Sequence, residues 1–541
     1  MKSSMQATPL SVARLLTHGS TVHQRSTVAT WTGDGVRRAT YDEVGRRSAA
    51  LAHGLRALGV DGDQRVGTFM FNNQEHLESY LAVPAMGAVL HTLNIRLFPD
   101  QLTYIVNHAA DHAVIVDAAV LPLFARIAPG LSSVRHIIVN GPADLDVLAG
   151  TSATIHSYDD VLAGQPTEFE WPDVDEDDAA ALCYTSGTTG NPKGVAYSHR
   201  SIWLHSMEVC MHEGFGLSDA DSVLAVVPQF HAMAWGLPYA AMMSGASLVM
   251  PDRFLQADPL LAMIASQRPT FAAAVPTIWS DLLRALDDHG GDVSSLREVV
   301  VGGSAVPPSL MHGFFDRYGL RIIHAWGMTE TSPLGSVARP PRSAGADEEW
   351  SYRYSQGRVP AAVEARLIGP DGAVLEWDGV SVGELEVRGP WITGGYFRDP
   401  DPEKFHDGWL RTGDVGRLTP DGYLTLTDRA KDVIKSGGEW ISSVELENLL
   451  IAHDGVLEAS VVGIPDERWG ERPLATVVLR EGTDVSVSDL REYLAGHVAH
   501  WQVPEYWALI DEVPKTSVGK FDKKVLRSRY AAGQLDVLTL D

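Results

Sequence analysis

The stretch YTSGTTGNPKG, residues 184–194, decides how the rest of the chain is interpreted. Serine and threonine hydroxyls, three glycines and Lys193 stand between the apolar segment 179–183 and the strand-like residues 195–197. One interpretation is a solvated linker, because linkers are often rich in glycine, serine and threonine. The other is a phosphate cradle, in which glycines let backbone N–H groups converge on an anion and a lysine supplies charge.

Two common phosphate-binding patterns do not fit this stretch. Pro192 precedes Lys193, so the Walker spacing G-x-x-x-x-G-K-[ST] is not met. A Rossmann G-x-G-x-x-G is also absent from it. If the stretch binds phosphate, it is therefore a third kind of phosphate loop.

The composition restricts the possible classes of protein. The chain has 541 residues, which is too long for one compact core, and its 45% hydrophobic and 21% charged residues are ordinary for a globular protein. The net charge of −26 argues against nucleic-acid binding, which requires a basic face. An anionic substrate would have to be attracted by local lysines, because the overall field repels it.

The cysteines and the hydropathy pattern indicate where the protein works. Cys183 and Cys210 are the two cysteines, so a disulfide framework is not expected. The N-terminal residues lack the apolar core of a signal peptide, and no apolar run reaches the roughly 18 residues of a membrane span. We expect a cytoplasmic protein without stable membrane insertion.

The order of strand-like and helix-like segments predicts an α/β fold with several parts. Short β-branched runs alternate with helical patterns over the first 350 or so residues, which is typical of parallel sheets with crossover helices. We expect an N-terminal domain over 1–428, made of two α/β subdomains and a small β-rich subdomain at about 355–428. A hinge at 429–433 and a small mobile α+β domain over 434–541 follow.

Several motifs, in a fixed order, resemble those of one enzyme family. Besides YTSGTTGNPKG they are VPQFHAMAW (227–235), VGGSAV (301–306), HAWGMTETSP (324–333), GWLRTGD (408–414), DRAKDVIKSGGEWIS (428–442) and PKTSVGK (514–520). Together they resemble the acyl-adenylate-forming superfamily, and most closely its fatty acyl-CoA synthetases. Because the resemblance covers nearly the whole chain, it makes the phosphate-loop interpretation of 184–194 far stronger than the linker.

The resemblance implies an AMP-forming acyl-CoA ligase that uses ATP, Mg²⁺ and coenzyme A. A carboxylate attacks the α-phosphorus of ATP to give acyl-AMP and pyrophosphate, and the CoA thiol then displaces AMP. Since the nucleophile is already ionised, catalysis should consist of positioning and charge stabilisation. The implied nucleotide-binding residues are Thr185, Ser186, Gly187, Thr188, Thr189, Gly190, Lys193, Gly303, Ser304, Ala305, His324, Ala325, Trp326, Gly327, Met328, Thr329, Asp414, Arg429 and Lys520.

The resemblance also assigns individual roles around ATP. Lys520 is the implied catalytic lysine, while Thr185 and Glu330 would hold Mg²⁺, although an ordinary solvated carboxylate is the alternative for Glu330. Trp326 matches a position that stacks on adenine, but it could be a core aromatic. Asp414 and Arg429 match residues that contact the ribose. For Lys523 and Lys524 we expect surface solvation.

The acyl pocket is implied to involve the residues His231, Trp235, Gly302, Gly303, Met328 and Pro333. His231 stands where amino-acid-activating relatives carry an aspartate, so an α-amino acid is not the expected substrate. On a helix, Trp235 would lie one turn beyond His231 and face the same side. We expect Trp235 to form one wall of the acyl pocket and so to favour short, unbranched acids, with 3-methylmercaptopropionate as the best candidate. The alternative is that Trp235 is a core aromatic away from the substrate.

The last assignments concern the C-terminal domain and assembly. Lys431 matches the domain hinge, where many members of the family have an aspartate. The CoA-binding residues implied by the resemblance are Lys435, Ser436, Gly437, Gly438 and Glu439. Relatives of this type often form twofold dimers, so we expect a homodimer. Medium- or long-chain fatty acyl-CoA synthesis, a luciferase-like oxygenase, a non-catalytic nucleotide-binding protein and a carrier-protein adenylation module are the alternative functions.

Overall fold

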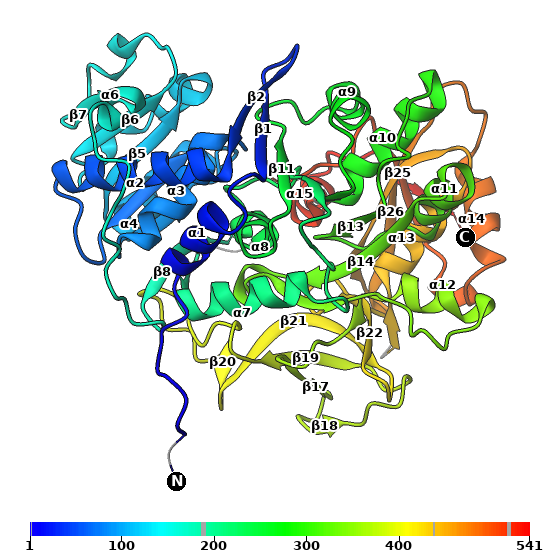
Figure 1. Ribbon diagram of the computed structural model, residues 1–541. Coiled ribbons are helices and arrows are strands. Elements are labelled where there is room, and N and C mark those ends of the chain that lie inside the picture. The colour runs from blue at the N-terminus through cyan, green and yellow to red at the C-terminus, as the bar shows by residue number, and fades with distance from the viewer. Residues whose placement is uncertain (2, 186–190, 437–438, 517–520, 541) are drawn as a thin grey trace.

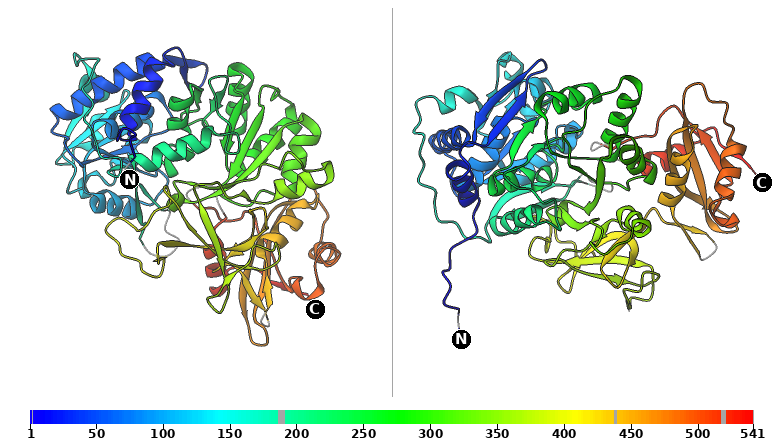
Figure 2. Two further views of the ribbon diagram at one scale, coloured as in Figure 1. Left: turned by 60° about the horizontal axis from the view of Figure 1, so that its bottom comes forward. Right: turned by 45° about the vertical axis from the view of Figure 1, so that its right-hand side comes forward.

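The computed structural model describes residues 1, 3–185, 191–436, 439–516 and 521–540 (Figures 1 and 2). Within these residues the strands form three sheets, two of them large. The orange-to-red C-terminal part lies at one end of the molecule in Figure 2. The expected α/β class, with large N-terminal sheets and a small C-terminal domain, is confirmed.

The first large sheet is built from the N-terminal third of the chain. Its strand order is β7-β6-β5-β3-β4-β8-β9, and all neighbours are parallel except β8 and β9. The buried run Val114–Val116 explains the strand β5, because a parallel strand covered on both faces is apolar throughout. The bounds are β3 Arg65–Phe69, β4 Val89–Thr92, β5 Asp111–Asp117, β6 His136–Asn140, β7 Thr154–Ser157, β8 Ala179–Tyr184, β9 Gly194–Ser198, α2 Tyr41–Ala57, α3 Gln74–Ala85, α4 Pro99–Ala109, α5 Leu121–Phe124 and α6 Tyr158–Leu162.

The second large sheet combines a parallel core with an antiparallel extension. Strands β1, β11, β10, β12, β13 and β14 are parallel, and β2 closes one edge. The bounds are β1 Thr27–Trp31, β2 Val36–Thr40, β10 Ser222–Leu224, β11 Ser247–Met250, β12 Phe271–Ala274, β13 Glu298–Gly302, β14 Arg321–Gly327, α1 Val12–Thr21, α7 His199–Cys210, α8 Leu237–Ser244, α9 Ala257–Gln267, α10 Pro276–His289, α11 Pro308–Tyr318 and α12 Ala346–Tyr354.

The β-rich region after residue 355 continues this second sheet. Strands β15 and β16 connect β14 to β22, so one hydrogen-bonded ladder runs from the parallel core into the antiparallel strands. Figure 1 shows these yellow strands below the green part of the sheet. The bounds are β15 Leu334–Val337, β16 Gly357–Arg358, β17 Glu364–Ile368, β18 Val374–Leu375, β19 Gly383–Arg388, β20 Phe405–His406, β21 Trp409–Leu418 and β22 Tyr423–Arg429.

The third sheet belongs to the C-terminal part. It begins at β23, directly after the segment 430–433 that follows β22. Alternating buried residues on β25 and β26 pack against α13 and α14 to form a separate core. The bounds are β23 Ile434–Ser436, β24 Glu439–Ile441, β25 Val456–Asp466, β26 Gly470–Leu479, β27 Tyr506–Leu509, β28 Leu538–Thr539, α13 Ser443–Ala452, α14 Val487–Ala495 and α15 Lys523–Ala531.

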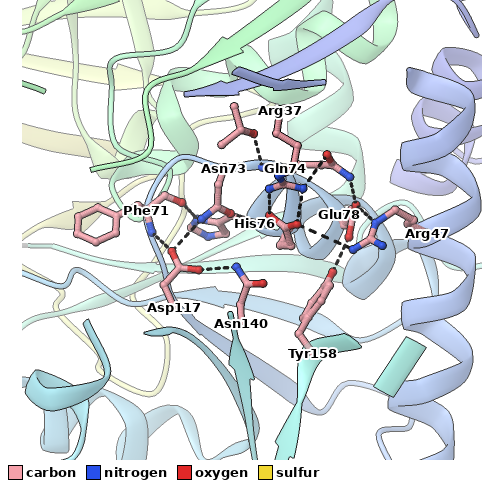
Figure 3. A network of polar contacts seen from close by, with 12 residues as sticks. Arg37, Arg47, Phe71, Asn73, Gln74, His76, Glu78, Asp117, Asn140 and Tyr158 are labelled. Atoms are coloured by element: carbon pink, nitrogen blue, oxygen red, sulfur yellow. Dashed lines mark hydrogen bonds and ion pairs between the residues drawn. The ribbon is translucent and has the colours of Figure 1, made fainter. Parts of the chain in front are cut away.

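A polar network at the start of α3 connects the two large sheets (Figure 3). Arg37 of β2 donates to Glu75 of α3 over 2.7 Å. Asp117, at the end of β5, accepts hydrogen bonds from the Phe71 backbone N–H (2.7 Å) and from Asn73 Nδ2 (2.9 Å). These bonds satisfy buried polar groups, which would otherwise be costly. Further members of the network are Arg47, Gln74, His76, Glu78, Asn140 and Tyr158.

The neighbouring Asn72 fixes the segment that contains VPQFHAMAW. Its Nδ2 donates to the carbonyls of Ala225 (2.7 Å) and Val227 (2.8 Å), and its Oδ1 accepts from the Gln229 backbone N–H (2.7 Å). The Tyr80 hydroxyl also donates to the Gln229 carbonyl. The junction of the two sheets therefore sets the course of the chain as it approaches His231 and Trp235.

None of the helices formed by the described residues has both the length and the apolar character needed to cross a membrane.

Candidate active site

A cleft of about 1100 Å³ lies where the large sheets, the β-rich strands and the C-terminal part meet. Parallel strands β13 and β14 end there, as expected for ligand sites in α/β sheets. Most of the predicted site residues line this one cleft: Thr185, Lys193, His231, Trp235, Gly302, Gly303, Ser304, Ala305, His324, Ala325, Trp326, Gly327, Met328, Thr329, Glu330, Pro333, Asp414, Arg429 and Lys431. Ser186, Gly187, Thr188, Thr189, Gly190 and Lys520 lie outside the described residues.

The ends of the predicted phosphate loop are joined by the hairpin pairing of β8 and β9. The Thr185 backbone N–H donates to the Lys193 carbonyl (2.9 Å), and the Lys193 backbone N–H donates to Thr185 Oγ1 (3.1 Å). The Lys193 ammonium lies 2.6 Å from Asp401 Oδ2 and 4.8 Å from the centre of the Tyr396 ring. The hydrogen bond to Asp401 raises the pKa of Lys193, so this cation is held at the cleft in its charged form.

Glu330 is a buried carboxylate, 5% exposed, and the alternative of a solvated side chain is therefore wrong. The Tyr396 hydroxyl donates to Glu330 Oε1 over 2.6 Å, and the Thr393 backbone N–H donates to the Glu330 carbonyl. The hydroxyl of Tyr197 donates to the carbonyl of the adjacent Thr329 over 2.6 Å. These bonds fix both residues where they line the cleft.

Trp326 connects the core of the β-rich strands to the cleft. Its indole packs against Gly335, where a Cβ would lie 2.2 Å from Trp326 Cζ3, and its Nε1 donates to Asp414 Oδ2 over 2.8 Å. Asp414 Oδ1 lies 3.2 Å from Arg429 Nε. The indole thus belongs to a hydrophobic core and also orients Asp414; stacking on adenine remains a prediction.

The chain around Trp235 differs from the sequence-based expectation. Residues 232–235 all have positive φ, from 42° to 55°, and α8 begins only at Leu237. The expectation that His231 and Trp235 share one face of a right-handed helix is therefore wrong. Left-handed backbone costs roughly 1–2 kcal/mol for each non-glycine residue, so the surrounding structure must hold this turn in place. The bonds from Asn72 to residues 225–229 fix the segment that leads into it.

Trp235 nevertheless lies beside the other predicted acyl-binding residues. Its side chain is 9% exposed, and a Cβ added to Gly302 would stand 3.4 Å from Trp235 Cη2 and 2.7 Å from the Ala325 carbonyl oxygen. Gly302 therefore allows a close approach of the indole and of β14. Met328 and Pro333 are joined by the bond from the Met328 N–H to the Pro333 carbonyl, 3.1 Å.

The predicted CoA-binding residues lie away from the cleft as far as they are described. Lys435 is exposed, and Ser436 Oγ accepts from Arg472 over 3.1 Å. Glu439 pairs with Ser436 across the β23–β24 hairpin, while Gly437 and Gly438 lie outside the described residues. In their place Lys515, Thr516 and Phe521, which flank 517–520, line the cleft.

The structure adds residues that the sequence reasoning missed. Tyr396, Asp401 and Lys404 all line the cleft, and the signal that could have found them is the GGYF stretch at 394–397. Lys523 is also not solvated as expected: it is 13% exposed and its Nζ lies 2.9 Å from Glu447, because burial of the ammonium requires a partner.

Comparisons with known proteins agree with this geometry. The family model "AMP-binding enzyme" matches residues 17–397, and "AMP-binding enzyme C-terminal domain" matches 445–520. The chain is 43% identical to a 3-methylmercaptopropionyl-CoA ligase of Ruegeria lacuscaerulensis, over 98% of this chain and 99% of that protein. It is 42% identical to a medium-chain-fatty-acid–CoA ligase of Ectopseudomonas oleovorans, over 98% of both.

A solved structure extends the likeness to the fold. The anthranilate CoA ligase AuaEII, in complex with anthranoyl-AMP, has a TM-score of 0.88 at 27% identity, covering 98% of this chain and 100% of that one. The chain belongs to the AMP-binding enzyme family. It is an acid–thiol ligase, an AMP-forming acyl-CoA synthetase that binds ATP and a carboxylic acid, and the enzyme class expected from the motifs is confirmed.

Proposed function

We propose that this ligase activates a short- or medium-chain acid, with 3-methylmercaptopropionate as the favoured substrate. Overall identity does not separate this acid from medium-chain fatty acids, because the two relatives differ by a single percentage point. The observation that carries the proposal is the position of Trp235, whose nearly buried indole lies against Gly302 at the cleft. A large rigid side chain that lines the cleft, as His231 also does, leaves less depth for an acyl chain.

In the first half-reaction the residues of the cleft position ATP and the acid. The carboxylate oxygen forms a bond to the α-phosphorus as the bond to the bridging oxygen breaks, and pyrophosphate leaves. Thr185 and Lys193 would contact the β- and γ-phosphates, Thr329 the α-phosphate, and Asp414 with Arg429 the ribose. Lys520 would stabilise the charge that accumulates between the carboxylate and the α-phosphate. Residues 303–305 and 324–328 would surround the adenine.

Glu330 and Thr185 suit a magnesium ion. Glu330 offers a buried carboxylate, and Thr185 offers a hydroxyl, which are oxygen ligands of the kind that Mg²⁺ prefers. Among the described residues, Tyr396 is the single hydrogen-bond donor to the Glu330 side chain, so much of the carboxylate's acceptor capacity is left for a cation. When bound, the ion would neutralise charge on the departing pyrophosphate.

The second half-reaction would require the C-terminal domain to turn about Lys431. In the described arrangement Lys515 and Phe521 line the cleft, whereas Lys435 and Ser436 do not. This arrangement suits adenylate formation, because it brings the residues on both sides of Lys520 to the nucleotide. A turn would bring Lys435, Ser436, Gly437, Gly438 and Glu439 to the acyl-AMP, where the thiol attacks the acyl carbon and AMP leaves.

The substrate proposal is tested by pyrophosphate release across straight-chain acids of two to twelve carbons. The decisive pair is 3-methylmercaptopropionate and pentanoate, which differ by a sulfur in place of one methylene. We expect the highest kcat/KM for these short acids, with the thioether ahead. A maximum at octanoate or beyond would instead support the alternative of a medium- or long-chain fatty acyl-CoA synthetase.

We also propose that the enzyme is a homodimer, as its resemblance to fatty acyl-CoA synthetases implies. Sedimentation equilibrium at micromolar concentration checks this, and a mass near the 58.6 kDa of one chain would contradict it.

A further inference from the structure

Lys404 lies in the loop between the GGYF stretch and β21, and hydrogen bonds fix both its backbone N–H and its backbone carbonyl. Its N–H donates to the Asp401 carbonyl (3.1 Å) and to Asp401 Oδ1 (3.2 Å), and its carbonyl accepts from the Arg411 N–H (2.9 Å). The next residue, Phe405, packs edge-on against Tyr396 with ring centres 5.0 Å apart. The direction in which the Lys404 side chain leaves the loop is therefore fixed.

The Lys404 side chain lines the same cleft as Glu330 and Asp414, two carboxylates predicted to serve nucleotide binding. Its Nζ donates to the Thr412 carbonyl (3.1 Å), and a Cβ on Gly413 would lie 3.9 Å from it. Glu330 and Asp414 both attract this ammonium electrostatically, yet no acidic group of the described residues lies within 4.0 Å of it. Burial lowers the pKa of Lys404. Glu330 and Asp414 act to raise this pKa, and Arg429 acts to lower it.

A half-buried ammonium bonded to a neutral carbonyl is expensive unless another group completes its shell. The nearby Lys193 has such a partner in Asp401, whereas Lys404 has only the Thr412 carbonyl among the described residues. Lys404 thus presents to the cleft an ammonium that has no ion-pair partner among the described residues. An anionic ligand group would complete the shell.

We propose that Lys404 binds the α-phosphate of the nucleotide. The inference rests on the proposed roles of Glu330 and Asp414. If Asp414 holds the ribose and Glu330 the metal at the outer phosphates, the group between them in a nucleoside triphosphate is the α-phosphate. Lys404 lies near Asp414, because its Nζ bonds to the carbonyl of Thr412, two residues earlier. It lies near Glu330 because the adjacent Phe405 packs against Tyr396, which bonds to Glu330, and all of these groups except Phe405 line the same cleft. Lys404 then donates to oxygens of the phosphate group whose phosphorus reacts, and it remains in contact with AMP and acyl-AMP after pyrophosphate has left.

A purely structural role makes a different prediction. If Lys404 only anchors residues 412–414 of β21, its loss would disturb the ribose site and weaken every adenosine ligand alike. If it binds the α-phosphate, its loss would weaken AMP and leave adenosine unaffected. The comparison of AMP with adenosine therefore separates the two roles without reference to turnover.

The test is titration calorimetry of AMP and of adenosine with the full-length wild type, Lys404→Met, Lys404→Arg and the control Arg411→Met. Arg411 lies close by on β21 and its backbone N–H bonds to the Lys404 carbonyl, but its guanidinium bonds to Glu384 (2.6 Å) and does not line the cleft. A hydrogen bond between charged groups is worth roughly 1.5–3 kcal/mol, so Lys404→Met should lose about 10- to 100-fold in AMP affinity. Adenosine affinity should change by less than about twofold, Lys404→Arg should retain most AMP affinity, and the control should match the wild type.

Equal losses for AMP and adenosine, or no loss for either, would overturn the α-phosphate role. Should Lys404→Met fail to fold, Lys404→Gln gives the same comparison. Wild-type enzyme is assayed in parallel for ATP-dependent CoA ester formation from the acids above. If the wild-type enzyme turns over an acid but Lys404→Met binds AMP as tightly as the wild type does, only the inference about Lys404 is rejected. If the wild-type enzyme turns over none of the acids, the proposed function is rejected.

Discussion

Replacing Trp235 tests both the acyl pocket and the unusual backbone beneath it. Trp235 has φ +55°, and its indole is nearly buried against Gly302. Trp235→Ala removes the indole but keeps a Cβ on a left-handed residue, whereas Trp235→Gly removes both. Because glycine adopts positive φ without steric cost, the two variants differ mainly in backbone strain.

The stability difference between the variants has an unusual sign. Truncating a buried tryptophan costs about 3–5 kcal/mol in either variant. Elsewhere alanine is more stable than glycine by roughly 0.5–1 kcal/mol, but here relief of left-handed strain should make Trp235→Gly more stable by about 1 kcal/mol. For a domain of this size that corresponds to about 1 °C in Tm, which replicate thermal scans can resolve.

The selectivity change is larger and is measured by kcat/KM for pyrophosphate release. Each methylene that gains an apolar contact is worth about 0.8 kcal/mol, so the three that separate octanoate from pentanoate could change the ratio by up to roughly 60-fold. Both truncations should move preference toward octanoate. Trp279→Leu is the control, since Trp279 is a buried tryptophan of α10 that does not line the cleft.

An equal drop for both acids in the Trp235 variants, with an unchanged ratio, would show that Trp235 is only a core aromatic. A Trp235→Ala variant more stable than Trp235→Gly would refute the account of backbone strain independently of selectivity.

Three further changes test other parts of the molecule. Lys520→Ala should lower adenylate formation roughly 10²-fold or more by removing charge from the transition state, while thioester formation from pre-made acyl-AMP survives; equal loss of both half-reactions contradicts this. Tyr396→Phe removes the donor to Glu330 and should raise the Mg²⁺ concentration needed for half-maximal rate by about 10-fold, as a magnesium titration will show. Burial raises the pKa of Asp117 to about 7 from its ordinary 3.8, so its contribution to stability is present below about pH 4 and lost as the pH rises to about 7. The Tm of Asp117→Asn should therefore rise relative to wild type between about pH 5 and pH 7.5, and a constant difference would reject the raised pKa.

The sequence allowed prediction of those features that depend on local pattern. The strand-like residues 179–183 and 195–197 around the phosphate loop do pair as β8 and β9, and Glu330 and Asp414 do line one cleft. Strand and turn preferences are properties of short segments, and the motifs preserve spacing along the chain. Family and fold class followed from the same patterns.

Other features depend on contacts between distant segments and left no local signal. Lys193 meets Asp401 from 208 residues away, and Lys523 meets Glu447, so neither pair can be read from neighbouring residues. Alanine, methionine and tryptophan have no preference for positive φ, so the left-handed turn at 232–235 leaves no signal in the local sequence. The segment that leads into it is fixed by a distant residue, Asn72, through its bond to Gln229.

The contacts across the expected hinge explain how one cleft could serve two reactions. Asp428, the penultimate residue of β22, accepts a hydrogen bond from the Ser443 N–H at the start of α13 (2.8 Å), so this bond joins the two sides of segment 429–433. If the C-terminal domain turns, the bond must break and re-form in each cycle. The Ser443 hydroxyl also donates to Asp428, and the Ser442 hydroxyl donates to the Thr427 carbonyl, so at least three hydrogen bonds cross the segment. Each contributes about 0.5–3 kcal/mol net, so together they bias the arrangement while each can still exchange during turnover. By contrast, the ion pair of Lys523 with Glu447 joins α15 to α13 within the C-terminal part and can remain intact throughout the motion. A rigid-body rotation of the C-terminal domain requires this arrangement: contacts across the hinge exchange, while contacts within the domain persist.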